Sequence, residues 1–197
     1  MAALVGNLPW PTLLHEVSQH GAAFAAGAVG QPCCVQLMSE LDSGPFEQVA
    51  PVIGSVRQEG ESFEVRVEKL TSRYPVLAYL CDELADQIHR HGASEWLPNE
   101  VAVQRYHPRS GGITPHRDHR RFALLVAVIT VAGSAPFTVC RNRAGDPIRT
   151  WQASEGALVL LRGPGLAGKV DGRPMHAVGG PTGGMPRTSI GIRMQGP

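Results

Sequence analysis

The segment from Arg187 to Arg193 has the sequence RTSIGIR, in which two kinds of side chain alternate. On an extended strand, residues two apart point to the same side, so one face carries the threonine and both isoleucines and is suited to packing. The other face carries Ser189 and Gly191 between the two arginines. At about 3.3 Å per residue the arginine backbones lie roughly 20 Å apart, which leaves a gap for a short dicarboxylate between two guanidinium forks. The alternation predicts a strand with an anion-binding face; a solvated edge strand is the alternative.

The residues upstream, from Asn99 onward, contain further short runs of strand-forming residues, most of them separated by Gly-, Pro- or Asp-rich turns. Short strands at this spacing are typical of a double-sheet sandwich or jelly roll. The chain has 23 Gly and 16 Pro, too many for a helical bundle. The expected strands are Val101–Tyr106, Phe122–Val131, Pro136–Cys140, Ile148–Trp151, Ala157–Leu161, Met175–Val178 and Arg187–Met194.

The N-terminal half has a mixed pattern with more helix. Apolar residues recur at helical spacing between Pro75 and Gly92, and Pro75 suits a first helical turn because no N–H is needed there. A second helix is expected from Pro11 to about Ala26. Apolar and charged residues alternate over 63–68, which predicts a half-buried strand.

The length of 197 residues suits one domain with a sizeable core. We therefore expect a single α+β domain, mainly β. Residues 1–98 would form a helical N-terminal layer, and residues 99–197 a jelly-roll core.

Charge and cysteine content exclude several classes of protein. A net charge of +1 gives no global basic field for nucleic acid or membrane. No apolar run approaches the roughly 20 residues of a membrane span, and the N-terminus lacks the charged region of a secretory signal. The 4 cysteines have no C-x-x-C spacing, which leaves a zinc knuckle without support and favours buried thiols in a reducing compartment. We expect a cytoplasmic monomer.

The clearest chemical motif is the tripeptide His116-Arg117-Asp118. On an extended segment its first and third residues point the same way, so they can offer an imidazole nitrogen and a carboxylate oxygen to one ion. His176, in the short strand expected after a Gly-rich loop, is a candidate third ligand. Two histidines and one carboxylate on one face of an ion, with the other positions open, suit non-haem Fe(II).

A third element is the expected strand Val101–Tyr106, in which Gln104 and Tyr106 project to the same side. Both side chains can donate hydrogen bonds to a carboxylate. The alternative is a buried tyrosine that only satisfies its own hydroxyl.

Taken in chain order, N-x-x-x-Q-x-Y, H-x-D, a distant histidine and R-x5-R resemble the Fe(II)/2-oxoglutarate-dependent oxygenases, specifically the AlkB-like branch. The resemblance covers about residues 99–194, and R-x5-R after the distal histidine is its most specific feature. It implies a double-stranded β-helix (jelly roll) with N-terminal helices and a lid, in which His116, Asp118 and His176 hold iron.

The resemblance also implies roles for the polar residues. Arg187 would pair with the distal carboxylate of the cosubstrate 2-oxoglutarate, helped by Tyr106. Arg193 would lie near the keto-acid end, together with Gln104. AlkB-like members commonly carry asparagine where this chain has Gln104 and Ser189. Compared with asparagine, Gln104 carries its amide one methylene further from the backbone. Ser189 is shorter than asparagine, which implies fewer contacts with the cosubstrate.

The implied reaction consumes 2-oxoglutarate and O2. 2-Oxoglutarate would be decarboxylated to succinate and CO2, and a C–H bond of the substrate would be hydroxylated; where that carbon is bonded to nitrogen, the outcome is demethylation. Two alternatives come from other classes: a catalytically silent binding or sensor module of the same fold, and a cupin-like metal protein that uses His116, His119 and His176. His107 or His119 is also an alternative ligand.

The substrate class follows from the residues around the motif. The expected lid, residues 54–74, offers only Phe63 and Tyr74 to stack a flipped base, which favours a small-molecule or peptide substrate. The arginine-rich run 117–121 can meet phosphates, so alkylated nucleic acid is the second substrate class. The Gly-rich segment 163–172 is expected to be a connector or a gate.

Overall fold

The computed structural model describes residues 2–196. The helices are α1 (Trp10–His20), α2 (Gln31–Leu41), α3 (Leu70–Arg73) and α4 (Pro75–Arg90), with 3-10 turns η1 (Val67–Lys69) and η2 (Leu166–Gly168). The strands are β1 (Ala22–Ala25), β2 (Glu47–Gln48), β3 (Val52–Ile53), β4 (Val56–Arg57), β5 (Glu61–Arg66), β6 (Glu100–Tyr106), β7 (Ile113–His116), β8 (Phe122–Ala132), β9 (Ser134–Cys140), β10 (Pro147–Ser154), β11 (Leu158–Arg162), β12 (Met175–Val178) and β13 (Arg187–Gln195).

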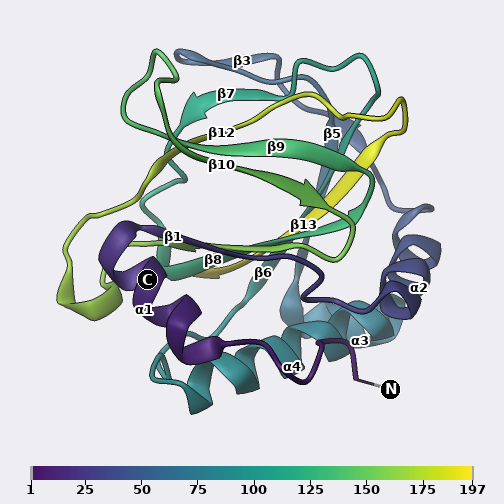
Figure 1. Ribbon diagram of the computed structural model, residues 1–197. Coiled ribbons are helices and arrows are strands. Elements are labelled where there is room, and N and C mark those ends of the chain that lie inside the picture. Colours follow the sequence, from purple (N-terminus) through teal and green to yellow (C-terminus); the bar gives the residue numbers. More distant parts are fainter. Residues whose placement is uncertain (1, 197) are drawn as a thin grey trace.

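Two antiparallel sheets face each other, as in a jelly roll (Figure 1). The larger sheet has the strand order β1-β11-β8-β13-β6-β5-β2, and the smaller sheet has the order β10-β9-β12-β7. A separate hairpin pairs β3 with β4. The helices α1, α2 and α4 cover the outer face of the larger sheet, so its inner face is free to form a site with the smaller sheet.

The first hydrophobic core lies between the helices and the larger sheet. Four apolar residues of α4 are fully buried in it: Leu77, Leu80, Leu84 and Ile88. The indole Nε1 of Trp96, also fully buried, donates a hydrogen bond to a backbone carbonyl of β8 at 2.8 Å. This core holds the helices against the outer face of the larger sheet.

The second core lies between the two sheets and includes Phe122, Phe137, Leu161 and Val178. Buried polar side chains lie in the same space, among them His176 and Arg187. Because buried polar groups need partners, this inter-sheet space is where a functional site is expected.

The sequence-based strand predictions after Asn99 are confirmed, with end shifts of a few residues. The helix expected over Pro11–Ala26 is wrong at its C-terminal end. Gly21 takes a left-handed conformation (φ +88°) that caps α1 after His20, and the chain then continues as β1 along the edge of the larger sheet. The helix α2 and the strand β7 were not expected.

The N-terminal half also contributes strands to the sheet. β1, β2 and β5 all join the larger sheet, beside the helical layer that we expected from residues 1–98. The lid expected over 54–74 contains β5 and α3, and its aromatic residues lie in the first core. Phe63 is 6% exposed and Tyr74 is 2% exposed, and their rings stack at 5.9 Å. These rings are therefore not available to stack a base.

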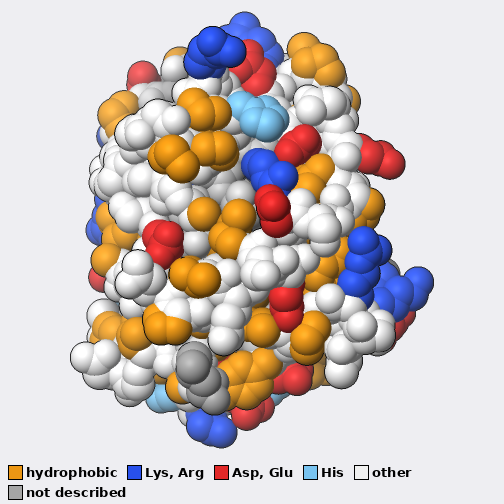
Figure 2. Space-filling view, turned by 90° about the vertical axis from the view of Figure 1, so that its right-hand side faces the viewer, with side chains coloured by type: hydrophobic (Ala, Val, Ile, Leu, Met, Phe, Trp, Pro, Cys, Tyr) orange, Lys and Arg blue, Asp and Glu red, His pale blue; other side chains and the backbone are white. Residues whose placement is uncertain are grey.

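Charges on the α2 and β5 side of the molecule are balanced locally. Figure 2 shows this face with acidic and basic side chains interspersed. Arg105, for example, pairs with Asp42 at 3.0 Å and with Glu61 at 3.4 Å. Among residues 2–196, no helix is both long enough and apolar enough to cross a membrane.

The cysteines provide a test of the packing. All are free and buried, as expected, and burial raises the pKa of Cys34 and of Cys81 to about 12. Because the thiolate is the reactive form, we expect the native protein to react negligibly with Ellman's reagent at about pH 8. After unfolding in guanidinium chloride, every cysteine should react. Rapid release of thionitrobenzoate from the native protein would contradict this packing.

Candidate metal centre and anion pocket

The pairing of β12 with β7 places the two histidines opposite each other. His176 and His116 are partners in the antiparallel register, and their ring centroids lie 4.3 Å apart. Each Nδ1 lies within hydrogen-bond distance of the carbonyl two residues earlier, Thr114 at 3.0 Å and Pro174 at 3.3 Å. Since a carbonyl only accepts, these contacts select the tautomer that leaves each Nε2 free to bind a metal.

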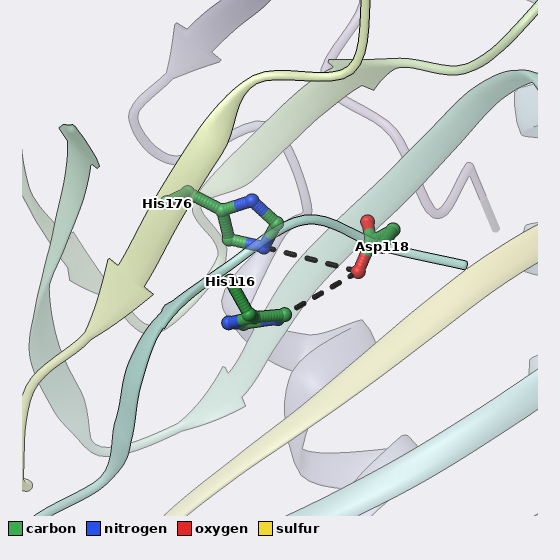
Figure 3. Close-up of side chains that lie close together, drawn as sticks. All are labelled: His116, Asp118 and His176. Carbon is green, nitrogen blue, oxygen red and sulfur yellow. Dashed lines mark ion pairs between the residues drawn. The ribbon is translucent and has the colours of Figure 1, made fainter. Parts of the chain in front are cut away.

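Asp118 completes the cluster. Its Oδ1 lies 3.8 Å from Nε2 of His116 and 3.9 Å from Nε2 of His176, and Figure 3 shows the three side chains converging. The candidate ligand atoms all lie within 4.8 Å of one another. Metal–nitrogen and metal–oxygen bonds are about 2.1 Å long. One ion therefore fits between the aspartate oxygen and either imidazole nitrogen. Among the described residues, this is the cluster that can hold a metal.

The charge state of His116 favours metal binding. Burial, with the neighbouring imidazole of His176 as a second cause, lowers the pKa of His116 to about 4. His116 is therefore a neutral imidazole at physiological pH, which is the form that coordinates a metal.

Arg187 lies on the facing sheet and is 1% exposed. Its Nη1 donates to Ser189 Oγ at 3.1 Å and its Nη2 to Thr130 Oγ1 at 2.9 Å. Within residues 2–196 its Nε has no hydrogen-bond partner, and no carboxylate lies within 4.0 Å of the guanidinium. Burial lowers the pKa of Arg187 to about 10, so the group is still a cation at neutral pH. A buried cation that lacks an anion is costly, and an anionic ligand would compensate it.

Tyr106 lies beside this cation. It is the partner of Arg187 in the pairing of β6 with β13 and is 4% exposed. Burial raises the pKa of Tyr106, which keeps the phenol protonated and able to donate a hydrogen bond.

One cavity between the sheets contains every site residue that the sequence predicted. Metal-ligand candidates line one part of it, polar and basic residues of β6 and β13 line another, and apolar side chains form the rest. The lining residues are Gln104, Tyr106, Ile113, His116, Asp118, Val126, Val128, Phe137, His176, Val178, Arg187, Ser189, Gly191 and Arg193.

The two arginines of β13 are not equivalent. Arg193 Nη1 lies 3.1 Å from Glu100 Oε1 and 3.4 Å from Glu64 Oε1, and its guanidinium lies over the ring of Phe122. Its charge is already balanced by protein carboxylates, whereas that of Arg187 is not. Of the two guanidinium forks expected to flank the anion pocket, that of Arg187 is the one without a carboxylate partner among the described residues.

Both alternative histidine ligands, His107 and His119, lie outside the cluster. His119 is exposed, and its Nδ1 accepts a hydrogen bond from the backbone N–H of Arg121 at 3.1 Å. The cupin-like set with His119 in place of Asp118 is therefore not the one that the fold assembles.

Sequence reasoning missed Thr130, which holds the Arg187 guanidinium, and Phe137, whose ring stacks on His176 at 5.3 Å. Alternation could have found Thr130, because Val126 and Val128 precede it on the same face of β8 and line the cavity.

Comparisons with known proteins identify the fold. No protein-family model matches the chain, and no curated protein matches it. Solved structures do. A Pseudomonas putida prolyl-4-hydroxylase superposes with a TM-score of 0.64 at 12% identity, covering 95% of this chain and 99% of that one. A Trichoplax adhaerens prolyl hydroxylase, in complex with a hypoxia inducible factor peptide fragment, superposes with a TM-score of 0.66 at 13% identity, covering 94% and 88%.

A third structure is the carbocyclase SnoK from nogalamycin biosynthesis, described as non-heme and alpha-ketoglutarate dependent. It superposes with a TM-score of 0.66 at 11% identity, covering 98% of this chain and 86% of that one. The chain therefore has the double-stranded β-helix fold of these oxygenases, as the sequence predicted. At this level of identity the likeness establishes the fold, and the chemistry has to be argued from the site.

Because the two arginines differ in their partners, replacing each of them should change the free energy of unfolding in opposite directions. Arg187→Met removes a buried cation that has no carboxylate partner, so we expect the metal-free protein to become more stable, by about 1–4 kcal/mol. Arg193→Met leaves Glu100, which is 3% exposed, without its cation, so we expect a loss of about 3–5 kcal/mol.

The measurement is the free energy of unfolding in urea for the two variants and the parent protein. Strong destabilisation by Arg187→Met would contradict the assignment of an unpaired cation.

Proposed function

We propose that this protein is an Fe(II)/2-oxoglutarate-dependent oxygenase that hydroxylates a C–H bond of a small-molecule or peptide substrate, with conversion of 2-oxoglutarate and O2 to succinate and CO2. One observation carries the proposal. A His-Asp-His cluster with metal-ligand spacing and a buried, unpaired guanidinium line the same cavity.

The donor set fits the metal. Two imidazoles and one carboxylate, those of His116, His176 and Asp118, occupy one side of the ion position, which is the arrangement that non-haem Fe(II) oxygenases use. Bound iron would supply the activation of O2 that no side chain can provide. The backbone carbonyls behind both histidines hold the rings in the orientation needed for binding.

The anion pocket fits 2-oxoglutarate. Arg187 would pair with the distal carboxylate, and Tyr106 would donate a hydrogen bond to the same group. Ser189 and Thr130 accept hydrogen bonds from the guanidinium and keep it directed into the cavity. Gln104 lines the same cavity and would bind the cosubstrate through its amide.

The apolar lining has a role of its own. Val126, Val128, Phe137 and Val178 form the apolar part of the cavity lining, beside the polar groups. Apolar neighbours lower the local dielectric constant, which strengthens the pairing between Arg187 and a carboxylate.

Two observations favour a small molecule or peptide over alkylated nucleic acid. The aromatic residues of the expected lid, Phe63 and Tyr74, are buried in the core. The net charge is +1, and the charges in Figure 2 are interspersed. The exposed arginine-rich run 117–121 is the feature that supports the AlkB-like alternative, an oxidative demethylase.

An active enzyme is also favoured over a silent sensor module, since every predicted ligand and the unpaired Arg187 are present.

The test of the proposal is anaerobic titration. Fe(II) and 2-oxoglutarate together should give the weak visible charge-transfer band of the chelate. His116→Ala should abolish the band, and Arg187→Met should raise the 2-oxoglutarate concentration needed for it by about 10–100-fold, because charge-assisted hydrogen bonds are lost. Arg90→Met, an exposed change on α4, is the control. A band that survives in His116→Ala would overturn the ligand assignment.

The substrate class is tested separately, by succinate formation with methylated oligonucleotides, peptides and metabolite pools. Stimulation by oligonucleotides alone would favour the demethylase.

A further inference from the structure

The segment Asp171–Pro174 lies between the Gly-rich loop and β12 and contacts both halves of the metal centre. The carbonyl of Pro174 lies 3.3 Å from Nδ1 of His176. The guanidinium of Arg173 donates from Nη1 to the backbone carbonyl of Asp118. This short segment therefore contacts two candidate metal ligands, the imidazole of His176 and the main chain of Asp118.

Asp118 needs such a contact more than the histidines do. His116 lies at the end of β7 and His176 lies in β12, so the sheet ladder fixes both backbones. Asp118 lies beyond the end of β7, in a stretch without regular secondary structure. A backbone outside the ladder lacks strand partners, and a side-chain donor to its carbonyl takes their place.

Asp171 fixes the guanidinium that makes this contact. Arg173 Nε lies 2.9 Å from Oδ1 of Asp171, and Arg173 Nη2 lies 2.9 Å from Oδ2, a two-point pairing. The backbone N–H of Arg173 donates to the same carboxylate at 3.2 Å. The side chain of Arg173 is 11% exposed. Bidentate pairing of this kind restricts rotation, so Nη1 is held toward Asp118.

The segment is itself anchored to the larger sheet. Arg162, at the end of β11, donates from Nε to the carbonyl of Gly172 at 2.8 Å and from Nη1 to the carbonyl of Ser18 in α1. Lys169 donates to that same Ser18 carbonyl at 2.9 Å. The Gly-rich loop is thus tied at several points, which supports its role as a connector.

We propose that Arg173 is a positioning residue that, oriented by Asp171, holds the backbone of Asp118 so that its carboxylate faces the metal position of His116 and His176. The inference rests on the proposed metal centre. Arg173 acts through Asp118 and touches neither metal nor substrate.

The test is the affinity of the metal-free protein for Mn(II) alone, measured by electron paramagnetic resonance of the free ion. Arg173→Met should weaken Mn(II) binding about tenfold, at the lower end of the range for loss of a partner behind a metal ligand. The sign is informative, because removing a nearby cation would by electrostatics alone strengthen binding of Mn(II). Arg173→Lys keeps a donor for the Asp118 carbonyl and should recover part of the loss.

Asp171→Asn provides a second variant, since it weakens the pairing that orients Arg173 while preserving the shape of the side chain. We expect Mn(II) binding to weaken by about threefold or more. Loss of this negative charge would by electrostatics alone also weaken binding, so Arg173→Leu, which removes the cation as Arg173→Met does, decides the question if Arg173→Met does not fold. The matched controls are Arg90→Met and Asp86→Asn, which break an exposed ion pair of α4 and should leave the affinity unchanged.

Mn(II) affinity within twofold of the parent protein in folded Arg173→Met, or tighter binding, would overturn the positioning role while leaving the metal centre intact. A parent protein that takes up no Mn(II) would instead overturn the metal centre and the proposed function with it. Loss of thermal stability without loss of affinity would show that Arg173 only supports the loop.

Discussion

The burial of the Arg187 guanidinium is the constraint on which the rest of the site depends. β13 lies between β8 and β6 in the larger sheet, so both edges of its backbone are hydrogen bonded and the position of Arg187 is fixed. The hydroxyls of Ser189 and Thr130 satisfy two of its nitrogens but supply no negative charge. The protein thus maintains a costly cation in its interior, and a carboxylate ligand is the simplest compensation.

The jelly roll places this cation opposite the candidate metal centre. The histidines come from β7 and β12 of the smaller sheet, while Arg187 comes from the larger one. A bifunctional ligand, with a chelating end and a distal carboxylate, would bridge the two sheets. The same arrangement explains why Phe137 packs flat on His176: the apolar side chain closes the space between the polar groups of the two sheets.

Local alternation in the sequence predicted much of this arrangement. The pattern of β13 placed Arg187 and Ser189 on the cavity face and the isoleucines in the core, and the structure agrees. Alternation in β6 likewise placed Gln104 and Tyr106 toward the cavity. These predictions needed only the period of a strand, which a single segment contains.

Features that depend on register or on main-chain conformation were beyond such reasoning. The pairing of Arg193 with Glu100 arises because the two residues are partners across β13 and β6, a relation that neither strand contains by itself. The end of α1 depends on the left-handed Gly21. The contact of Arg173 with Asp118 joins two loops whose proximity only the folded chain determines.

Calorimetric titration of the Mn(II)-loaded protein with 2-oxoglutarate and with 2-oxopentanoate tests the central claim most directly, because the second compound keeps the chelating end and lacks the distal carboxylate. The account predicts that 2-oxoglutarate binds at least about tenfold more tightly, a difference of about 1.4 kcal/mol. Equal affinities for the two compounds would contradict it.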